Sequence, residues 1–167
     1  AAWARGDIDA AWFWEPNLDK AVKRGGNIFM TSGIMEKRGY PTWDVGVVMN
    51  DFAEKYPEYV NKFVKAECDG IDYWIKNPEK TAKIIAEELS LSLDDATRMM
   101  KGTEMVPCDK QLTAQYMGTT GNIGGFADTL VKTSKFLVSE KRLPVQLTRK
   151  SYERFLDPSY LENVVGK

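Results

Sequence analysis

The sequence predicts an α/β fold, with three short strands near the N-terminal end followed by a predominantly helical part. Three apolar runs, each closely bounded by turn-forming residues, lie within the first 50 of the 167 residues. Short bounded runs of this kind are typical of buried strands. After Asn50 the apolar residues recur every three or four positions, which is the period of an amphipathic helix. Because strands alternate with helical segments in the first part, we expect a largely parallel sheet.

The first 50 residues are expected to alternate between helices and strands. Residues 1–5 are predicted to end a helix at the turn Gly6-Asp7, and a second helix over 17–24 is closed by Gly25-Gly26. The predicted strands cover residues 9–14, 27–31 and 43–49, and the third (WDVGVVM) is the most apolar. Three strands are few for the amount of helix that follows, so we expect the strands that complete the sheet to lie outside this chain.

The remainder of the chain is predicted to be helical. Pro57 and Pro78 suit the first turn of a helix, and Ser92 with Asp95 resembles a capping box. The predicted helices cover residues 52–55, 57–77, 78–89, a segment from 92 onward, 123–141 and 158–165. We find no internal repeat in the sequence.

Composition excludes several classes of function. The chain carries 23 basic and 24 acidic residues in a mixed distribution, so nucleic acid is not an expected partner. It has no long apolar run that would span a membrane. It contains no histidine, the most common general base and metal ligand. We therefore expect no metal and no cofactor, and an enzyme would have to work with carboxylates alone.

The two cysteines allow two interpretations. Cys68 and Cys108 lie 40 residues apart without a CxxC partner. The more common situation is a pair of isolated small side chains, and the alternative is a disulfide, because spacing alone does not settle pairing. Neither cysteine supports a zinc site.

Two carboxylates follow aromatic residues at predicted strand ends, where α/β proteins place ligand groups. Asp44 stands between Trp43 and an apolar run, and an unpaired buried carboxylate there would be costly. It is the stronger candidate for binding a cationic group, with indole rings adding cation–π contact. Glu15 follows Trp14, and it is at least as well explained as a cap of the helix that begins after Pro16.

The aromatic run Trp12-Phe13-Trp14 is expected to divide between core and cleft. Side chains of a strand alternate between its faces, so Trp12 and Trp14 share one face. We expect Trp12 and Phe13 to belong to the core, and Trp14, at the strand end, to line the ligand cleft.

Two glycine-containing segments are expected to be turns. Residues 119–125 (TTGNIGG) lack the lysine and the preceding strand of a phosphate-binding loop. A flexible turn in which Asn122 caps the following helix explains them. Ser32-Gly33 is likewise interpreted as a turn, although it could offer a hydroxyl and an N–H to a ligand.

Two segments of the sequence are the most specific, namely AAWARGDIDAAWFWEP at residues 1–16 and YPTWDVGVVMNDFAEKYPEYVNKFVKA at 40–66. They resemble the NMT1/THI5-like, type II periplasmic binding proteins of ABC importers, which include binders of taurine, aliphatic sulfonates and nitrate. The resemblance extends over nearly the whole chain to DPSYLENV at 157–164.

The resemblance implies two α/β lobes that close over a small ligand, with this chain corresponding to the C-terminal half. Residues 1–42 would be the C-terminal part of lobe 2, and 43–167 the crossover strand and the helical end of lobe 1. By the same resemblance, Asp44 receives the ammonium of a taurine-like ligand and Trp14 lines the cleft. Trp43, Thr42 and Glu15 complete the candidate ligand-binding residues.

The family further implies a small zwitterionic or anionic ligand and a cognate ABC permease as partner. It also implies a periplasmic or otherwise extracytoplasmic parent protein, either free or lipid-anchored. The alternatives are an alkanesulfonate- or nitrate-type anion binder, a THI5-like enzyme of pyrimidine-precursor synthesis, and a helical interaction module without ligand. The chain begins with Ala-Ala-Trp and shows no signal segment, so we expect a mature product or a fragment. As a half-protein it would expose apolar faces and self-associate.

Overall fold

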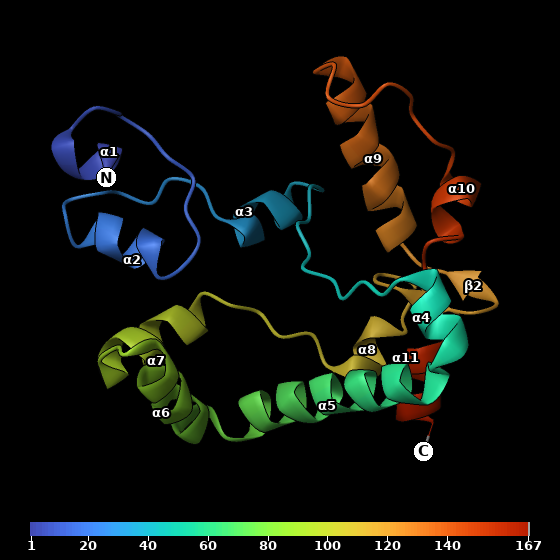
Figure 1. Cartoon of the computed structure of the whole chain (residues 1–167). Coiled ribbons are helices and arrows are strands. Elements are labelled where there is room, and N and C mark those ends of the chain that lie inside the picture. Colours follow the sequence, from blue (N-terminus) through green and yellow to red (C-terminus); the bar gives the residue numbers. More distant parts are fainter. Residues whose placement is uncertain (167) are drawn as a thin grey trace. The chain divides into compact units, whose positions relative to one another are not determined.

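The computed structural model describes residues 1–166, which form eleven helices and one two-stranded antiparallel hairpin (Figure 1). The chain divides into two compact units, the first made of Ala1–Thr42 and Lys76–Glu104 and the second of Trp43–Ile75 and the residues from Met105 onward. None of the helices in the described part is long and apolar enough to cross a membrane.

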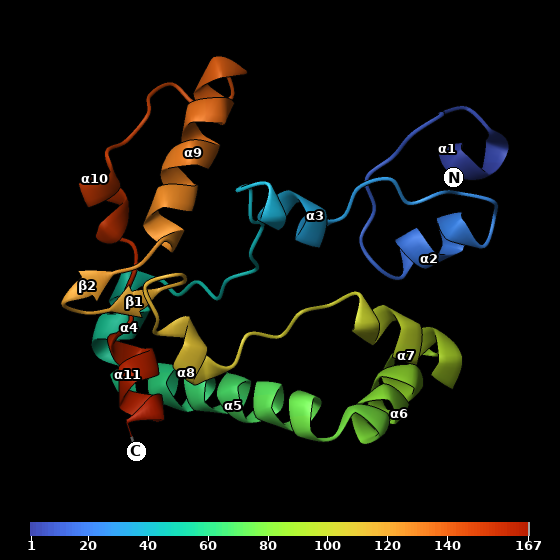
Figure 2. The same ribbon diagram turned by 180° about the vertical axis from the view of Figure 1, so that it is seen from behind.

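The first unit joins three short helices to a pair of longer ones. These are α1 (Ala2–Arg5), α2 (Asn17–Val22), α3 (Ser32–Lys37), α6 (Pro78–Leu89) and α7 (Leu93–Lys101). Helices α6 and α7 contact each other and lie side by side in Figures 1 and 2, and Ala82 of α6 and Ala96 and Met99 of α7 are buried. Small residues at two of these positions let the two helices approach closely.

The second unit contains the longest of the described helices, which has 20 residues. Its elements are α4 (Asn50–Lys55), α5 (Pro57–Lys76), α8 (Cys108–Gln111), β1 (Gly118–Thr119), β2 (Asn122–Ile123), α9 (Phe126–Ser139), α10 (Arg149–Glu153) and α11 (Ser159–Val165). Cys68 of α5 and Cys108 of α8 form a disulfide, so the second of the two interpretations of the cysteines holds. Helix α9 packs against α10, and α11 against α8.

Most of the predicted helices are confirmed, together with their end signals. Helix α1 ends at Gly6, whose φ of 77° is left-handed, a conformation that glycine adopts without a steric penalty. The Ser92 hydroxyl accepts a hydrogen bond from the backbone N–H of Asp95 at the start of α7. Pro57 and Pro78 each occupy the first position of their helix. Local signals therefore located these elements correctly.

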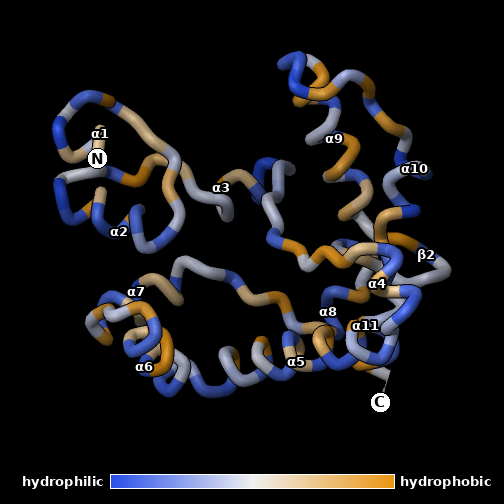
Figure 3. Tube along the Cα trace, viewed as in Figure 1, coloured by the Kyte–Doolittle hydropathy of each residue, from blue (hydrophilic) through white to orange (hydrophobic). Residues whose placement is uncertain are grey.

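The three predicted strands are wrong, and in place of an α/β sheet the described residues are mostly helical with one small hairpin. Residues 9–14, 27–31 and 43–49 belong to no strand. Within the described chain, 27–30 and 43–48 make no backbone hydrogen bond to another segment. A parallel strand exists only through hydrogen bonds to neighbouring strands, and an apolar run does not supply those partners. The apolar stretch that leads into α4 is evident in Figure 3.

Both glycine-containing segments also differ from expectation. Ser32-Gly33 begins helix α3, which is capped by the Thr31 hydroxyl accepting from the N–H of Ile34. Residues 118–123 form the hairpin, with Gly118 paired to Ile123 and Thr119 to Asn122. Asn122 therefore does not cap the following helix, which begins only at Phe126. A hairpin can use the same Asn and Gly residues as a cap, so the composition of the segment did not distinguish the two.

The described residues leave much apolar surface uncovered. No large side chain among them is less than 2% exposed, whereas Phe29, Val47 and Met49 are 77%, 91% and 74% exposed. Exposed apolar surface of this extent marks contact sites for other protein segments. The self-association of this chain stays a prediction.

Candidate ligand-binding site

The five candidate ligand residues fall into two groups. Trp14, Glu15 and Thr42 belong to the first unit, and the neighbours Trp43 and Asp44 belong to the second. Trp14 and Glu15 are sequence neighbours within the first unit, as are Trp43 and Asp44 within the second. A common site for all five stays a prediction.

Trp43 is held by two other aromatic rings of its own unit. Its ring centroid lies 5.0 Å from that of Phe126 and 5.7 Å from that of Tyr116, with interplanar angles of 47° and 48°. Tilted pairs at these separations are attractive. Trp43 is half-buried, whereas Asp44 beside it is exposed. The aromatic cluster Trp43–Tyr116–Phe126 therefore holds Trp43 in place, directly beside the exposed carboxylate of Asp44.

Trp14 and Glu15 lie at the start of α2. The indole of Trp14 is 76% exposed, and its carbonyl oxygen accepts hydrogen bonds from the N–H groups of Asn17 and Leu18. The Glu15 carboxylate accepts from the N–H of Asp19 at 3.0 Å. Carboxylates favour helix N-termini because they complement both the free N–H groups and the helix dipole. Glu15 therefore caps the helix, which is the alternative to ligand binding that the sequence suggested. A ligand role for Glu15 stays a prediction.

The expected division of the aromatic run is only partly observed. Trp12 is 54% exposed, so its assignment to the core is wrong in this unit. Phe13 is half-buried. The assignment failed because the run is not part of a sheet, and without a second layer above it neither face becomes core. Thr42 is also exposed.

An ionic cluster that sequence analysis missed joins α2 to α7. The Lys23 ammonium contacts Asp95 at 2.7 Å and Asp19 at 3.0 Å, and the Arg98 guanidinium contacts both carboxylates. Asp19 is only 6% exposed. Hydrogen bonds from Lys23, and then from Arg98 and the Ser92 hydroxyl, hold the pKa of Asp95 well below its usual range. The sequence signal was the i,i+4 spacing of Asp19 and Lys23 together with the i,i+3 spacing of Asp95 and Arg98.

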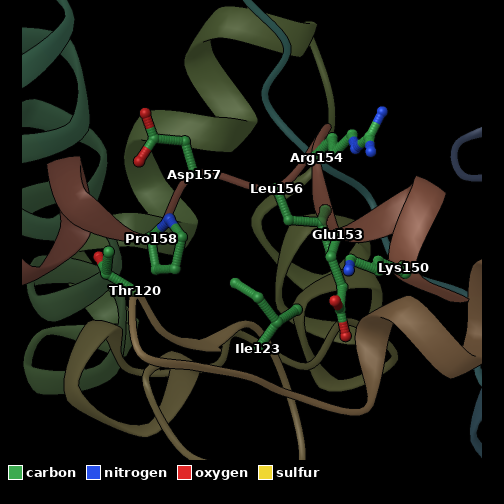
Figure 4. Close-up of a pocket in the computed structure, with 8 residues that line it drawn as sticks. All are labelled: Thr120, Ile123, Lys150, Glu153, Arg154, Leu156, Asp157 and Pro158. Carbon is green, nitrogen blue, oxygen red and sulfur yellow. The ribbon is translucent and has the colours of Figure 1, made fainter.

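The second unit contains a hollow of about 320 Å³ beside the hairpin (Figure 4). Its lining residues are Thr120, Ile123, Lys150, Glu153, Arg154, Leu156, Asp157 and Pro158. In Figure 4 the apolar side chains of Ile123, Leu156 and Pro158 gather around its middle, and the Arg154 guanidinium extends away from Ile123. None of the candidate ligand residues lines this hollow.

One wall of the hollow is fixed by a contact between the hairpin and α11. The Glu162 carboxylate accepts hydrogen bonds from the hydroxyl of Thr120 at 2.6 Å and from its N–H at 2.9 Å. These bonds lower the pKa of Glu162, the hydroxyl bond most strongly. The contact is structural, because both carboxylate oxygens are already engaged with the hairpin.

The available chemistry is that of cation recognition. Asp44 offers an exposed carboxylate beside an aromatic cluster, which suits an ammonium group through an ion pair and cation–π contact. The part of the chain that the structure covers has no group of three or more acidic or cysteine side chains placed to hold a metal ion.

No protein-family profile matches the chain. A comparison with curated proteins shows 34% identity over 152 residues to the taurine-binding periplasmic protein of Escherichia coli. The chain is a homologue of part of that protein. The match covers 86% of this chain and 44% of the relative, so the chain spans less than half of the relative's length. The resemblance inferred from the sequence is thereby confirmed, and the relative is a binding protein.

Proposed function

We propose that this chain is part of the substrate-binding component of an ABC transporter, and that its ligand is taurine or a related small sulfonate. The observation that carries the proposal is the 34% identity over 152 residues to a taurine-binding periplasmic protein. Identity at this level over most of the chain supports a related ligand class. The choice of taurine within that class rests on Asp44.

Asp44 would receive the ammonium group of the ligand. Taurine carries an ammonium and a sulfonate, and an anionic side chain repels an amine-free sulfonate but attracts the ammonium of a zwitterion. Asp44 is exposed and adjacent to the aromatic cluster, as recognition of an ammonium group requires. Trp14 and Trp43 would limit the length of the ligand and exclude water, with Thr42 and Glu15 nearby.

The ligand would lie in a cleft between two lobes. Residues 1–42 would contribute to lobe 2, and 43–167 would supply the crossover segment and the end of lobe 1. Closure of two lobes over a ligand is the usual hinge mechanism of periplasmic binding proteins. The sulfonate would be bound by parts of the protein outside this chain.

The proposed partner is a membrane permease that accepts the ligand from the closed protein. We place the protein outside the cytoplasm, because the relative is periplasmic and because the Cys68–Cys108 disulfide suits an oxidising compartment. No catalytic step is part of this function.

Calorimetry on the full-length gene product tests the proposal. Taurine is expected to bind, and Asp44→Asn is expected to weaken binding at least tenfold, which corresponds to about 1.4 kcal/mol. The loss is in the range for a hydrogen bond to a charged group. Glu54→Gln, which removes an exposed carboxylate from α4 of the same unit, serves as the matched control and should bind taurine normally.

A ligand panel separates the proposal from its nearest alternative. Ethanesulfonate has the sulfonate of taurine but lacks the amine, so an Asp44-based site should prefer taurine. Equal or tighter binding of ethanesulfonate or nitrate would support the alkanesulfonate- or nitrate-type alternative. Unchanged taurine affinity in Asp44→Asn would remove this residue from the site.

A further inference from the structure

The glycine-rich hairpin region is a tightly bonded structure. The N–H of Gly124 donates to the carbonyl of Met117 at 2.8 Å, and the N–H of Gly125 donates to that of Ala114 at 2.8 Å. The next N–H, that of Phe126, donates to the carbonyl of Tyr116 at 3.0 Å. Three consecutive donors thus bind the start of α9 to the segment before the hairpin. This region is not the flexible turn that the sequence predicted.

The glycines of this region are required by close backbone contacts. A Cβ atom on Gly118, whose φ is +77°, would lie 2.3 Å from the carbonyl oxygen of Asn122. One on Gly124 would lie 2.4 Å from the carbonyl oxygen of Tyr116. Both distances are far below van der Waals contact, and the atoms met are backbone atoms, which cannot rotate away as the end of a side chain can. The motif that resembles a phosphate loop therefore serves close backbone packing.

This packing places two aromatic rings together. The hydrogen bond from Phe126 to Tyr116 brings the two residues into register, and both rings contact Trp43, at 5.0 and 5.7 Å. Trp43 and the hairpin are more than 70 residues apart in the sequence, so this contact is purely tertiary.

The segment that follows Trp43 has few other attachments. Residues 43–48 make no backbone hydrogen bond to another segment in the described chain, and Val45 and Val47 are 52% and 91% exposed. The ring of Trp43 packs against Tyr116 and Phe126, whereas the Asp44 side chain next to it in the sequence is exposed.

We propose that Tyr116 and Phe126 are positioning residues for ligand binding, which hold the Trp43 ring and thereby direct the Asp44 carboxylate toward the ammonium of the ligand. This inference rests on the proposed function. The two residues act through Trp43 and touch no ligand atom. Their contribution is therefore specific to ligands that carry an amine.

The test is a double-mutant cycle on the full-length gene product, with taurine and ethanesulfonate as probes. Tyr116→Leu is expected to weaken taurine binding about three- to tenfold, the scale of one aromatic contact. Ethanesulfonate affinity should stay unchanged, and Tyr116→Phe, which keeps the ring, should restore taurine binding. In the Asp44→Asn background, Tyr116→Leu should have no further effect, because residues that act as a unit are not additive.

Tyr59→Leu is the matched control, since it removes an exposed aromatic ring from α5 of the same unit; it should alter neither affinity. Equal weakening of both probes by Tyr116→Leu, or additivity with Asp44→Asn, would show a merely structural role and overturn the positioning proposal. If Tyr116→Leu does not fold, Phe126→Leu takes its place, and failure of both to fold also overturns it. If Asp44→Asn loses the preference for taurine over ethanesulfonate and Tyr116→Leu keeps it, the positioning proposal is refuted but the proposed function stands. A wild-type protein that does not bind taurine refutes both.

Discussion

The disulfide should contribute a large part of the stability of this chain. Cys68 lies in the second half of α5 and Cys108 at the first position of α8, 40 positions later in the sequence. The loop that they close contains both α6 and α7. Replacing both cysteines by serine removes this constraint while leaving small side chains in place.

The expected magnitude follows from the length of the loop. Closing a loop of about 40 residues removes about 13 cal/mol/K of entropy from the unfolded chain, or about 4 kcal/mol at 25 °C. Because Cys68 is only 9% exposed, the serine hydroxyl that replaces its sulfur adds a desolvation cost of about 1 kcal/mol. The total expected loss of unfolding free energy is about 4–5 kcal/mol.

Urea unfolding followed by circular dichroism measures this loss. With a slope of about 2 kcal/mol/M, the midpoint of Cys68→Ser/Cys108→Ser should fall by about 2 M relative to the oxidised wild type. Reduced wild type should show most of the same decrease in midpoint. The remaining difference in midpoint between reduced wild type and the double variant measures the desolvation cost of the serine hydroxyl. Reductant added to the double variant is the control and should change nothing.

Two results would refute the reasoning. Midpoints of oxidised and reduced wild type that agree within about 0.3 M would show that the cross-link does not restrict the unfolded state. A decrease in the serine variant alone would assign the whole effect to packing around Cys68. Either outcome removes the entropic argument.

Three further predictions concern the ionic cluster and the hairpin. Asp19→Asn should lower the free energy of unfolding by about 1–3 kcal/mol in urea titrations, because a buried carboxylate that receives charged hydrogen bonds is lost; no change would make the cluster energetically neutral. Because the folded pKa of Asp95 is lowered, its stabilising effect is present above the unfolded pKa of about 4 and is lost as the pH falls through the lower folded value. Asp95→Asn should therefore be less stable than wild type at pH 7, with the difference shrinking below pH of about 4, whereas Asp94→Asn on the exposed side of α7 should match wild type at every pH. Gly118→Ala should cost at least about 2 kcal/mol by thermal unfolding from its positive φ and its backbone clash, while Gly121→Ala, which meets nothing within 4 Å, should change stability by less than about 0.5 kcal/mol.

The helices were predictable because their signals are local. A helix satisfies its backbone hydrogen bonds within one segment, so periodicity and end residues suffice to locate it. Pro57 and Pro78 marked two starts, Ser92 a third, and Gly6 an end, and all four stand where expected. The homology to a periplasmic binding protein was also recognisable from residues 1–16 and 40–66 alone.

Tertiary structure decided everything that depends on partners distant in sequence. The apolar runs 27–31 and 43–49 are typical of strands in the sequence. A strand, however, needs a neighbouring strand to bond its N–H and C=O groups, and within the described chain neither run pairs with one. Spacing left the pairing of Cys68 with Cys108 open, and only the approach of α5 to α8 settled it. Asp44 was predicted as a ligand residue from its sequence context, but the rings that hold its neighbour Trp43 come from residues 116 and 126, more than 70 positions away. Local periodicity determined the helices, whereas contacts between distant segments determined the disulfide, the ionic cluster and the aromatic cluster, since no local pattern records which segments will meet.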